Sequence, residues 1–194
     1  MFKNIQFVKS VYDLENLPPP KLPEIAFLGR SNVGKSSLIN AFLNRKKIAK
    51  VSSTPGFTKS INIFQVDNKF LLVDLPGYGF AKAPVKLIQH WKKLVEGYLT
   101  SQRNFKLLIL IFDIRRTPDN LDKNLISFVK YIKKPYCIVL NKIDTLSKNE
   151  IKKQKLLWEK ELFIPENILL FLVSCKTKEG IENFRKSILQ LINF

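Results

Sequence analysis

Residues 29–36 read Gly29-Arg30-Ser31-Asn32-Val33-Gly34-Lys35-Ser36, which fits the pattern G-x-x-x-x-G-K-S. An apolar run at 25–28 precedes this stretch and predicts a strand, and residues 36–43 follow it with the spacing of a helix. Glycines let such a loop curl until successive backbone N–H groups point into one concavity, and the helix N-terminus adds further N–H groups. We therefore predict that this stretch, the phosphate loop, binds the phosphates of a nucleotide. Lys35 is expected to reach the terminal phosphates, and Ser36 to place its hydroxyl on Mg²⁺.

Strands and helices alternate along the rest of the chain. Apolar runs predict six strands, at residues 25–28, 61–66, 69–74, 107–113, 136–140 and 168–173. Helical spacing and helix-start signals predict further helices that begin near residues 84, 119, 147 and 178. This order predicts an α/β fold with a mostly parallel six-stranded sheet, one antiparallel hairpin strand, and helices on both faces. Ligands of such sheets bind at the carboxyl ends of the strands.

The chain of 194 residues is long enough for one well-filled core. We expect an N-terminal arm with a proline-rich linker, residues 1–22, followed by a nucleotide-binding domain, residues 23–194. The prolines at positions 18–20 make the linker stiff and extended. Within the arm, residues 5–8 fit either an edge strand or a loose arm, and the sequence does not decide between them.

Charge is the most informative feature of the composition. Thirty-three Lys and Arg residues against sixteen Asp and Glu residues give a formal net charge of +17. Such an excess favours RNA, DNA or anionic lipid as a partner, although a basic solubilising surface is the alternative. The longest aliphatic and aromatic runs, at 107–112 and 168–173, are far shorter than the roughly 20 residues that a bilayer requires, so we expect no membrane-spanning segment. We also expect no membrane partner, because no predicted helix has the aromatic-rich, lysine-flanked face of an interfacial anchor. Two cysteines without metal-ligand spacing indicate a reducing compartment, which is the cytoplasm or an organellar matrix. Separately, we expect the protein to be a monomer.

Two stretches after the first helix are candidates for the metal and the terminal phosphate. Asp74 ends the second hairpin strand, and we predict that it holds a water on Mg²⁺, a cation that keeps several waters in protein sites. Gly77 lies three residues later, where its backbone N–H can meet a γ-phosphate without a side chain in the way. The polar segment 50–59 is expected to be a functional loop in which Thr54 or Thr58 binds Mg²⁺ and the γ-phosphate only in the triphosphate state.

A third group of residues is expected to select the base. Asn141-Lys142-Ile143-Asp144 follows one strand, and Ser174-Cys175-Lys176 follows another, which ends at Val173. An ionised Asp144 accepts hydrogen bonds from N1–H and the amine of guanine, whereas adenine would leave it facing an acceptor, a difference of roughly 10⁴ or more. Asn141 is expected either to take the N7 edge of the base or to brace the phosphate loop. The Lys142 stem would cover the ring, and the Cys175 N–H would donate to guanine O6.

These stretches together resemble one known family. The residues that carry the resemblance are 29–37, Thr54-Pro55-Gly56-Phe57-Thr58 and Asp74-Leu75-Pro76-Gly77-Tyr78-Gly79-Phe80-Ala81-Lys82. From about residue 5 to its end, the chain resembles the EngB (YihA/YsxC) proteins, which belong to the TrmE-Era-EngA-EngB-Septin-like P-loop GTPases. One departure is Asn141, where many members have threonine; it restores the general GTPase pattern.

The resemblance implies the P-loop GTPase fold, GTP hydrolysis, and a role in assembly of the large ribosomal subunit, with rRNA or its precursors as partner and a link to cell division. It favours Thr58 over Thr54 as the switch threonine. Tyr78 stands where Ras-type enzymes carry the glutamine that orients water, so we expect an unaided turnover on the order of 10⁻⁴ to 10⁻³ per second. Asn32 matches the position that helps to hold K⁺ in potassium-activated relatives.

The expected site can be stated as three sets of residues. Lys35, Thr58 and Gly77 are the catalytic candidates, and Ser36, Thr58 and Asp74 are the metal candidates. The residues expected to surround GTP or GDP are Gly29, Arg30, Ser31, Asn32, Val33, Gly34, Lys35, Ser36, Ser37, Pro55, Gly56, Phe57, Thr58, Asp74, Leu75, Pro76, Gly77, Asn141, Lys142, Ile143, Asp144, Val173, Ser174, Cys175 and Lys176.

Other functions remain as alternatives. A nucleotide kinase also has a phosphate loop, but it has no use for Asn141 and Asp144 together. A GTP-gated RNA-binding module with incidental hydrolysis is a closer rival, as is a GTPase switch for a non-ribosomal partner. His90, the only histidine, is expected on a surface helix because it has no partner for a triad or a zinc site.

Some residues have a structural interpretation. Trp91 and Trp158 are expected to pack in or at the edge of the core. Asp113 is expected to cap the loop after its strand. Arg115 and Arg116 fit either an rRNA contact or a local ion pair.

Overall fold

A computed structural model gives the fold, and it describes residues 2–45, 48, 60–79 and 84–193. The strands are β1 (Ile5–Val11), β2 (Glu24–Gly29), β3 (Ile61–Val66), β4 (Phe70–Asp74), β5 (Phe105–Asp113), β6 (Tyr136–Asn141) and β7 (Leu170–Val173). The helices are α1 (Lys35–Leu43), α2 (Val85–Thr100), α3 (Asn120–Tyr131), α4 (Lys148–Glu161) and α5 (Ile181–Leu191), with short 3₁₀ turns at Leu14–Asn16 and Ile143–Thr145.

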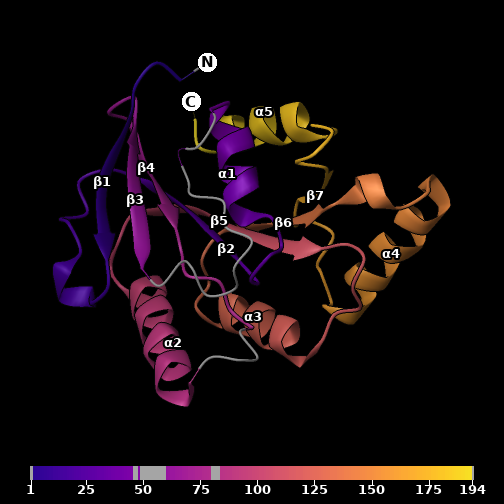
Figure 1. Ribbon diagram of the computed structural model, residues 1–194, viewed down its shortest axis with the longest axis horizontal. Coiled ribbons are helices and arrows are strands. Elements are labelled where there is room, and N and C mark those ends of the chain that lie inside the picture. Colours follow the sequence, from indigo (N-terminus) through magenta and orange to yellow (C-terminus); the bar gives the residue numbers. More distant parts are fainter. Residues whose placement is uncertain (1, 46–47, 49–59, 80–83, 194) are drawn as a thin grey trace.

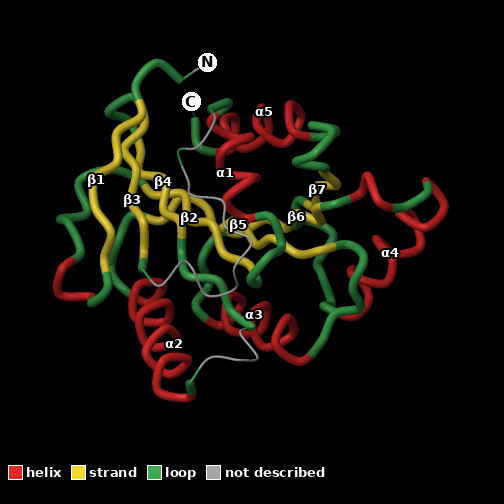
Figure 2. The backbone as a smooth tube through the Cα atoms, viewed as in Figure 1, coloured by secondary structure: helices red, strands yellow, loops and turns green. Residues whose placement is uncertain are grey.

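The strands form one sheet in the order β1-β3-β4-β2-β5-β6-β7. Helices α1 and α5 lie on one face, and α2 and α3 lie on the other (Figures 1 and 2). Strands β4, β2, β5, β6 and β7 run parallel, and β3 is antiparallel to β4. The α/β fold with a mostly parallel sheet is thus confirmed.

The sheet has seven strands, one more than the sequence predicted, because the N-terminal arm joins it. Strand β1 pairs antiparallel with β3, from Ile5 opposite Val66 to Val11 opposite Ile61. The Asp67 carboxylate anchors the start of this strand by accepting hydrogen bonds from the backbone N–H groups of residues 3 and 4, at 2.8 and 2.6 Å. The sequence allowed either an edge strand or a loose arm here, and the structure shows the edge strand.

Register brings the candidate site residues to one edge of the sheet. Phe27 on β2 pairs with Asp74 on β4. On the other side, Asp113 at the end of β5 pairs with Asn141, and Asn141 pairs with Val173. Parallel strands end at the same edge, so the loops that follow β2, β4, β5, β6 and β7 meet there.

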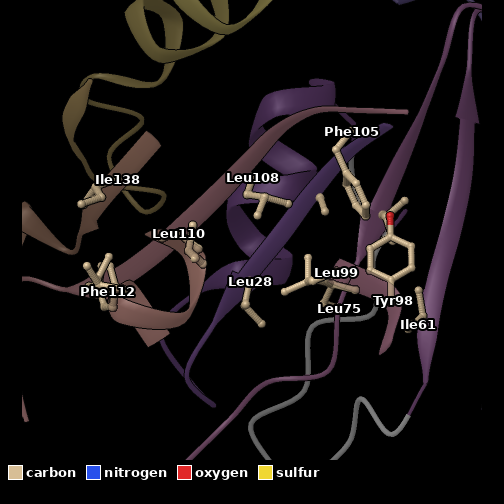
Figure 3. Packing of buried hydrophobic residues seen from close by; sticks show 14 of the residues in the cluster. Leu28, Ile61, Leu75, Tyr98, Leu99, Phe105, Leu108, Leu110, Phe112 and Ile138 are labelled. Atoms are coloured by element: carbon tan, nitrogen blue, oxygen red, sulfur yellow. The ribbon is translucent and has the colours of Figure 1, made fainter. Parts of the chain in front are cut away.

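Each face of the sheet has its own hydrophobic cluster. The cluster under α1 and α5 includes Phe42 and Phe184, whose ring centroids lie 5.9 Å apart. The opposite cluster, part of which is drawn in Figure 3, packs α2, α3 and α4 against the sheet. Trp158 belongs to this cluster and is 1% exposed, while Trp91 is 5% exposed, so both tryptophans are buried as predicted.

A buried ion pair fixes the start of β2 against the chain before β5. The Arg103 guanidinium donates to both carboxylate oxygens of Glu24 at 2.5–3.0 Å, and to the Pro18 carbonyl at 2.8 Å. The Tyr98 hydroxyl on α2 donates to the same carboxylate at 2.5 Å. Burial raises the pKa of Tyr98 well above its usual value, so its hydroxyl stays protonated as a donor.

Candidate nucleotide-binding site

The phosphate loop leaves β2 at Gly29 and enters α1 at Lys35. Gly34 precedes the helix in a left-handed conformation, with φ of 95°. A Cβ atom there would lie 2.3 Å from the Asn141 amide nitrogen, and one at Gly29 would lie 2.7 Å from the Ile111 carbonyl oxygen. Close packing against β5 and β6 therefore requires glycine at both ends of the loop, as the pattern predicts.

Lys35 and Asp74 form a buried ion pair at the mouth of this loop. The Lys35 Nζ donates to an Asp74 carboxylate oxygen, and both side chains are at most 6% exposed. Two buried opposite charges stabilise each other, and a phosphate with a divalent cation offers each of them a second partner. The carboxylate of Asp74 and the hydroxyl of Ser36 are hard oxygen donors, which fit Mg²⁺ when phosphate and water complete its shell.

No cluster of three or more His, Cys, Asp or Glu side chains that could hold a metal occurs among the described residues. At phosphate sites Mg²⁺ usually takes only one or two protein oxygens, with phosphate and water completing its shell.

The segment after β4 lies directly against the phosphate loop. The Ser31 N–H donates to the Tyr78 carbonyl at 3.0 Å, and the Tyr78 N–H donates to the Gly29 carbonyl at 3.3 Å. A Cβ at Gly77 would lie 3.3 Å from both Gly29 O and Ser31 N. Gly77 thus lies against the phosphate loop, and the contact of its N–H with a γ-phosphate stays a prediction.

A cavity of about 330 Å³ opens beside the phosphate loop at the ends of β6 and β7. Its lining comes from three loops and consists of Gly34, Ser37, Asn141, Lys142, Asp144, Thr145, Cys175 and Lys176. The phosphate loop and both stretches expected to read guanine therefore share one pocket.

Asn141 joins the parts of this pocket. Its amide nitrogen donates to the Val33 carbonyl at 2.9 Å, and its amide oxygen accepts from the Cys175 N–H at 3.3 Å. The side chain is buried, so both bonds are protected from water. Of the two roles that the sequence left open, the structure has Asn141 bracing the phosphate loop.

Hydrogen bonds also orient Asp144 and Lys142. The buried Ser174 hydroxyl donates to Asp144 at 2.6 Å and accepts from the backbone N–H groups of residues 176 and 177. The Lys142 ammonium donates to the Asn32 carbonyl at 2.7 Å and lies 2.9 Å from Asp113. With its ammonium held over the phosphate loop, the Lys142 stem lies along the pocket.

Asp113 caps the loop after β5, as predicted, because its carboxylate accepts from the Arg115 N–H at 3.2 Å, and it also forms ion pairs. Burial acts to raise the pKa of its carboxyl, but hydrogen bonds from Arg115 and Lys142 outweigh burial and lower the pKa to about 2. Arg115 pairs with Asp113 at 2.6 Å, and Arg116 pairs with Asp119 at 3.3 Å. Both arginines therefore form the local ion pairs that were one of their two alternatives.

Some predicted contact residues have side chains that point away from the pocket. Leu75, Ile143 and Val173 are at most 4% exposed and belong to the hydrophobic clusters, so only their backbones can face a ligand. Pro55, Gly56, Phe57 and Thr58, like Thr54, lie outside the described residues. His90 is exposed on α2, as predicted.

Comparison with known proteins identifies the family. The family described as "50S ribosome-binding GTPase" matches residues 24–142. A "Probable GTP-binding protein EngB" from Halothermothrix orenii is 44% identical over 192 residues, covering 98% of this chain and 96% of that protein. Another of the same description, from Geotalea daltonii, is 46% identical and covers 93% of this chain and 86% of that protein. The chain belongs to the EngB family of GTP-binding proteins.

Solved structures agree with this assignment at the level of fold. A crystal structure of a probable EngB protein superposes with a TM-score of 0.74 at 23% identity, covering 88% of this EngB chain and 98% of that chain. Era from Aquifex aeolicus, bound to GDP and an aluminium fluoride, gives a TM-score of 0.69 at 22% identity, covering 87% of this chain and 56% of Era. EngB membership makes this chain a GTP-binding protein of a GTPase family, with GTP or GDP as ligand.

Among the described residues, no helix combines the length and the apolar character needed to cross a bilayer.

Proposed function

We propose that this protein binds GTP and GDP with Mg²⁺, hydrolyses GTP slowly, and acts as a switch in assembly of the large ribosomal subunit. The observation that carries the proposal is the double hydrogen bond of Asn141, which ties the phosphate loop and the guanine-reading loop into one pocket. A ligand that fits both ends of this pocket needs phosphates at one end and a guanine at the other.

Each residue has a defined part in the proposal. Lys35 neutralises charge on the terminal phosphates, and the Gly77 N–H faces the γ-phosphate. Ser36 and Asp74, with Thr58, would hold Mg²⁺, which would supply positive charge to offset the charge that develops on the phosphates. Asp144, held by Ser174, accepts from guanine.

Titration with nucleotides in Mg²⁺ tests the binding step. We expect GTP and GDP to bind and ATP to bind at least 10³-fold more weakly, because adenine would leave the Asp144 carboxylate without a donor. Equal affinity for ATP and GTP, or no affinity for either, would refute the proposal.

The ribosomal part of the proposal has two supports. One is the family, whose description names 50S ribosome binding, and the other is the net charge of +17, which suits rRNA as partner. Sedimentation of the protein with large ribosomal subunits, under a GTP analogue, GDP and no nucleotide, tests this part. We expect co-sedimentation that depends on the nucleotide and falls steeply with salt; a protein that stays in the supernatant in all three would remove the ribosomal role.

A GTP-gated RNA-binding module is the second candidate, because the charge supports RNA binding whether or not hydrolysis matters. If the protein is a switch for a non-ribosomal partner, such as one in cell division, ribosomal particles should leave the rate of GTP hydrolysis unchanged. Stimulation of hydrolysis by ribosomal particles favours the switch in ribosome assembly over both.

The proposal also includes activation by K⁺, with Asn32 as the ligand. Asn32 is exposed at the phosphate loop with φ of 62°, so its side chain is accessible from solvent there. Single-turnover hydrolysis that is equally slow in K⁺ and Na⁺ would exclude this cofactor.

A further inference from the structure

Tyr78 is anchored to the first turn of α3 rather than turned toward the phosphate pocket. Its hydroxyl donates to the Asp122 carboxylate at 3.0 Å, and the Asp122 side chain is 1% exposed. Burial and the neighbouring Asp122 raise the pKa of Tyr78 well above its usual value, so the hydroxyl remains a donor. Asp122 lies 44 positions from Tyr78 in the chain, and no pattern in the sequence joins the two.

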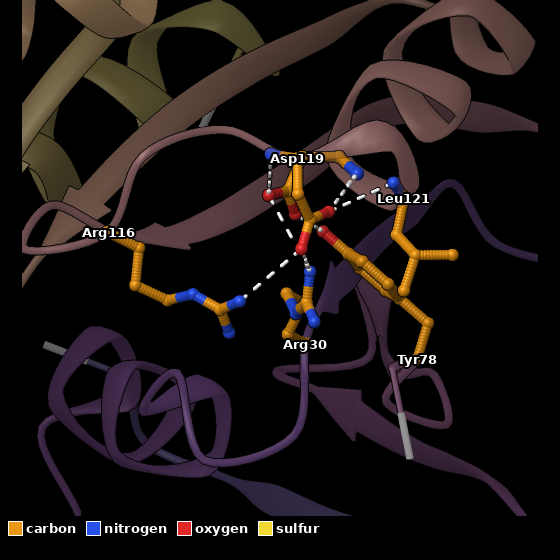
Figure 4. A network of polar contacts seen from close by, with 6 residues as sticks. Arg30, Tyr78, Arg116, Asp119 and Leu121 are labelled. Carbon is orange, nitrogen blue, oxygen red and sulfur yellow. Dashed lines mark hydrogen bonds and ion pairs between the residues drawn. The ribbon is translucent and has the colours of Figure 1, made fainter. Parts of the chain in front are cut away.

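Arg30 of the phosphate loop completes this contact (Figure 4). Its guanidinium donates to Asp119 at 2.5 Å, lies 3.7 Å from Asp122, and stands 5.9 Å from the centroid of the Tyr78 ring. Asp119 is also the N-cap of α3, where it accepts from the N–H groups of Leu121 and Asp122. One guanidinium thus holds the phosphate loop, Tyr78 and the start of α3 together.

The backbone carries this contact to Gly77. The two hydrogen bonds between the Tyr78 backbone and residues 29 and 31 fix the chain immediately after Gly77. Gly79 then turns away with φ of 79°, and a Cβ there would lie 3.0 Å from the Arg30 Nε. Gly79 therefore leaves room for the Arg30 guanidinium beside the backbone, at a left-handed φ that favours glycine.

We propose that Arg30, Asp122 and the Tyr78 hydroxyl form a latch that positions the Gly77 N–H for the γ-phosphate of GTP. Tyr78 is then a positioning residue, and its phenol takes no part in orienting the attacking water. The latch rests on the proposed function, because it has meaning only if GTP binds here. Through this latch, α3 becomes a third element whose position is coupled to the nucleotide, in addition to the phosphate loop and the segment after β4.

The variant Tyr78→Phe tests the latch, since it removes one hydroxyl and leaves the ring beside Arg30. We expect affinity for a non-hydrolysable GTP analogue to fall about tenfold, the scale of one hydrogen bond to a charged acceptor, while GDP affinity stays within about twofold. The difference arises because only the triphosphate places a phosphate at Gly77. Tyr131→Phe is the matched control, since Tyr131 is 81% exposed, and it should change neither affinity.

A second variant and a second measurement keep the test decisive. Asp122→Asn retains one carbonyl oxygen for the Tyr78 hydroxyl but loses the charge beside Arg30. We therefore expect affinity for the GTP analogue to fall by less than in Tyr78→Phe, again with GDP affinity nearly unchanged. Hydrogen exchange of the Tyr78 amide should accelerate in both variants. Unchanged GTP-analogue affinity in both variants, or an equal loss for GTP analogue and GDP, would overturn the latch. If the wild-type protein bound neither nucleotide, the proposed function itself would fail instead.

Discussion

Replacing Glu24 with glutamine removes one charge from a buried ion pair and leaves the shape of the side chain almost unchanged. Glu24 is fully buried, and Arg103 makes three hydrogen bonds to its carboxylate, with Tyr98 supplying a fourth. After Glu24→Gln, the Arg103 cation keeps the Pro18 carbonyl and a neutral amide in place of a carboxylate.

The magnitude follows from the burial of both partners. Breaking a buried ion pair by removing one charge costs about 3–5 kcal/mol, because the remaining charge stays away from water without compensation. A whole domain is stable by only about 5–15 kcal/mol, so this loss is a large part of the total. With a slope of about 2 kcal/mol per molar urea, the midpoint of unfolding should fall by about 2 M.

Urea unfolding followed by tryptophan fluorescence measures this effect. Glu182→Gln is the matched control, because Glu182 pairs with Lys186 on the surface of α5 with both side chains more than 70% exposed. Exposed pairs gain little in water, so the control should leave the midpoint nearly unchanged. Replacing both charges together with the Tyr98 hydroxyl that bonds to Glu24, as in Glu24→Leu with Arg103→Met and Tyr98→Phe, should recover most of the stability, since neither a lone charge nor an unpaired hydroxyl is then buried.

An unfolding midpoint for Glu24→Gln as high as that of the surface control would refute a role of the buried charge in stability. A small effect would mean that Arg103 reaches water or another acceptor after the substitution, and that the buried pair does not hold the start of β2. A combined variant that is less stable than Glu24→Gln would likewise contradict this explanation, because the unpaired charge would then not be the cause.

Three further predictions concern the nucleotide pocket. Asp144→Asn should lower GTP affinity by about 10²-fold or more and raise affinity for xanthosine triphosphate, whose C2 oxygen accepts from the new amide; calorimetry with both nucleotides checks this. Burial raises the pKa of Cys175 to about 12, so at pH 8 only about 10⁻⁴ of it is thiolate, and iodoacetamide should label the native protein far more slowly than the unfolded chain; equal rates by mass spectrometry would contradict this. Asp113 has its pKa lowered to about 2 by Arg115 and Lys142, so the stability it adds is present above pH 4 and is lost as pH falls from 4 toward 2; Asp113→Asn should flatten that limb in acid unfolding.

The sequence was most informative where chemistry depends on residues close together in the chain. The phosphate loop is fixed by glycines and a lysine within eight positions, and Asn141 and Asp144 lie three positions apart. Hydrophobic runs separated by helical spacing were enough to predict the parallel sheet, because each strand must be covered on both faces. These local patterns also predicted which strand ends would carry the site.

Tertiary structure decided what depends on distant partners. Pairing with β3, about 60 positions away in the chain, decided between the two alternatives for residues 5–8. The hydrogen bond from the Asn141 amide to the Val33 carbonyl decided between the two roles of Asn141. The Tyr78 hydroxyl and the Glu24 carboxylate each find a partner more than 40 positions along the chain. Their partners are single side chains without periodicity, so only the packing of α3, and of the chain that joins α2 to β5, against the sheet brings them within hydrogen-bond reach. A lone polar residue does not specify its partner, because burial and distance exist only in the folded chain.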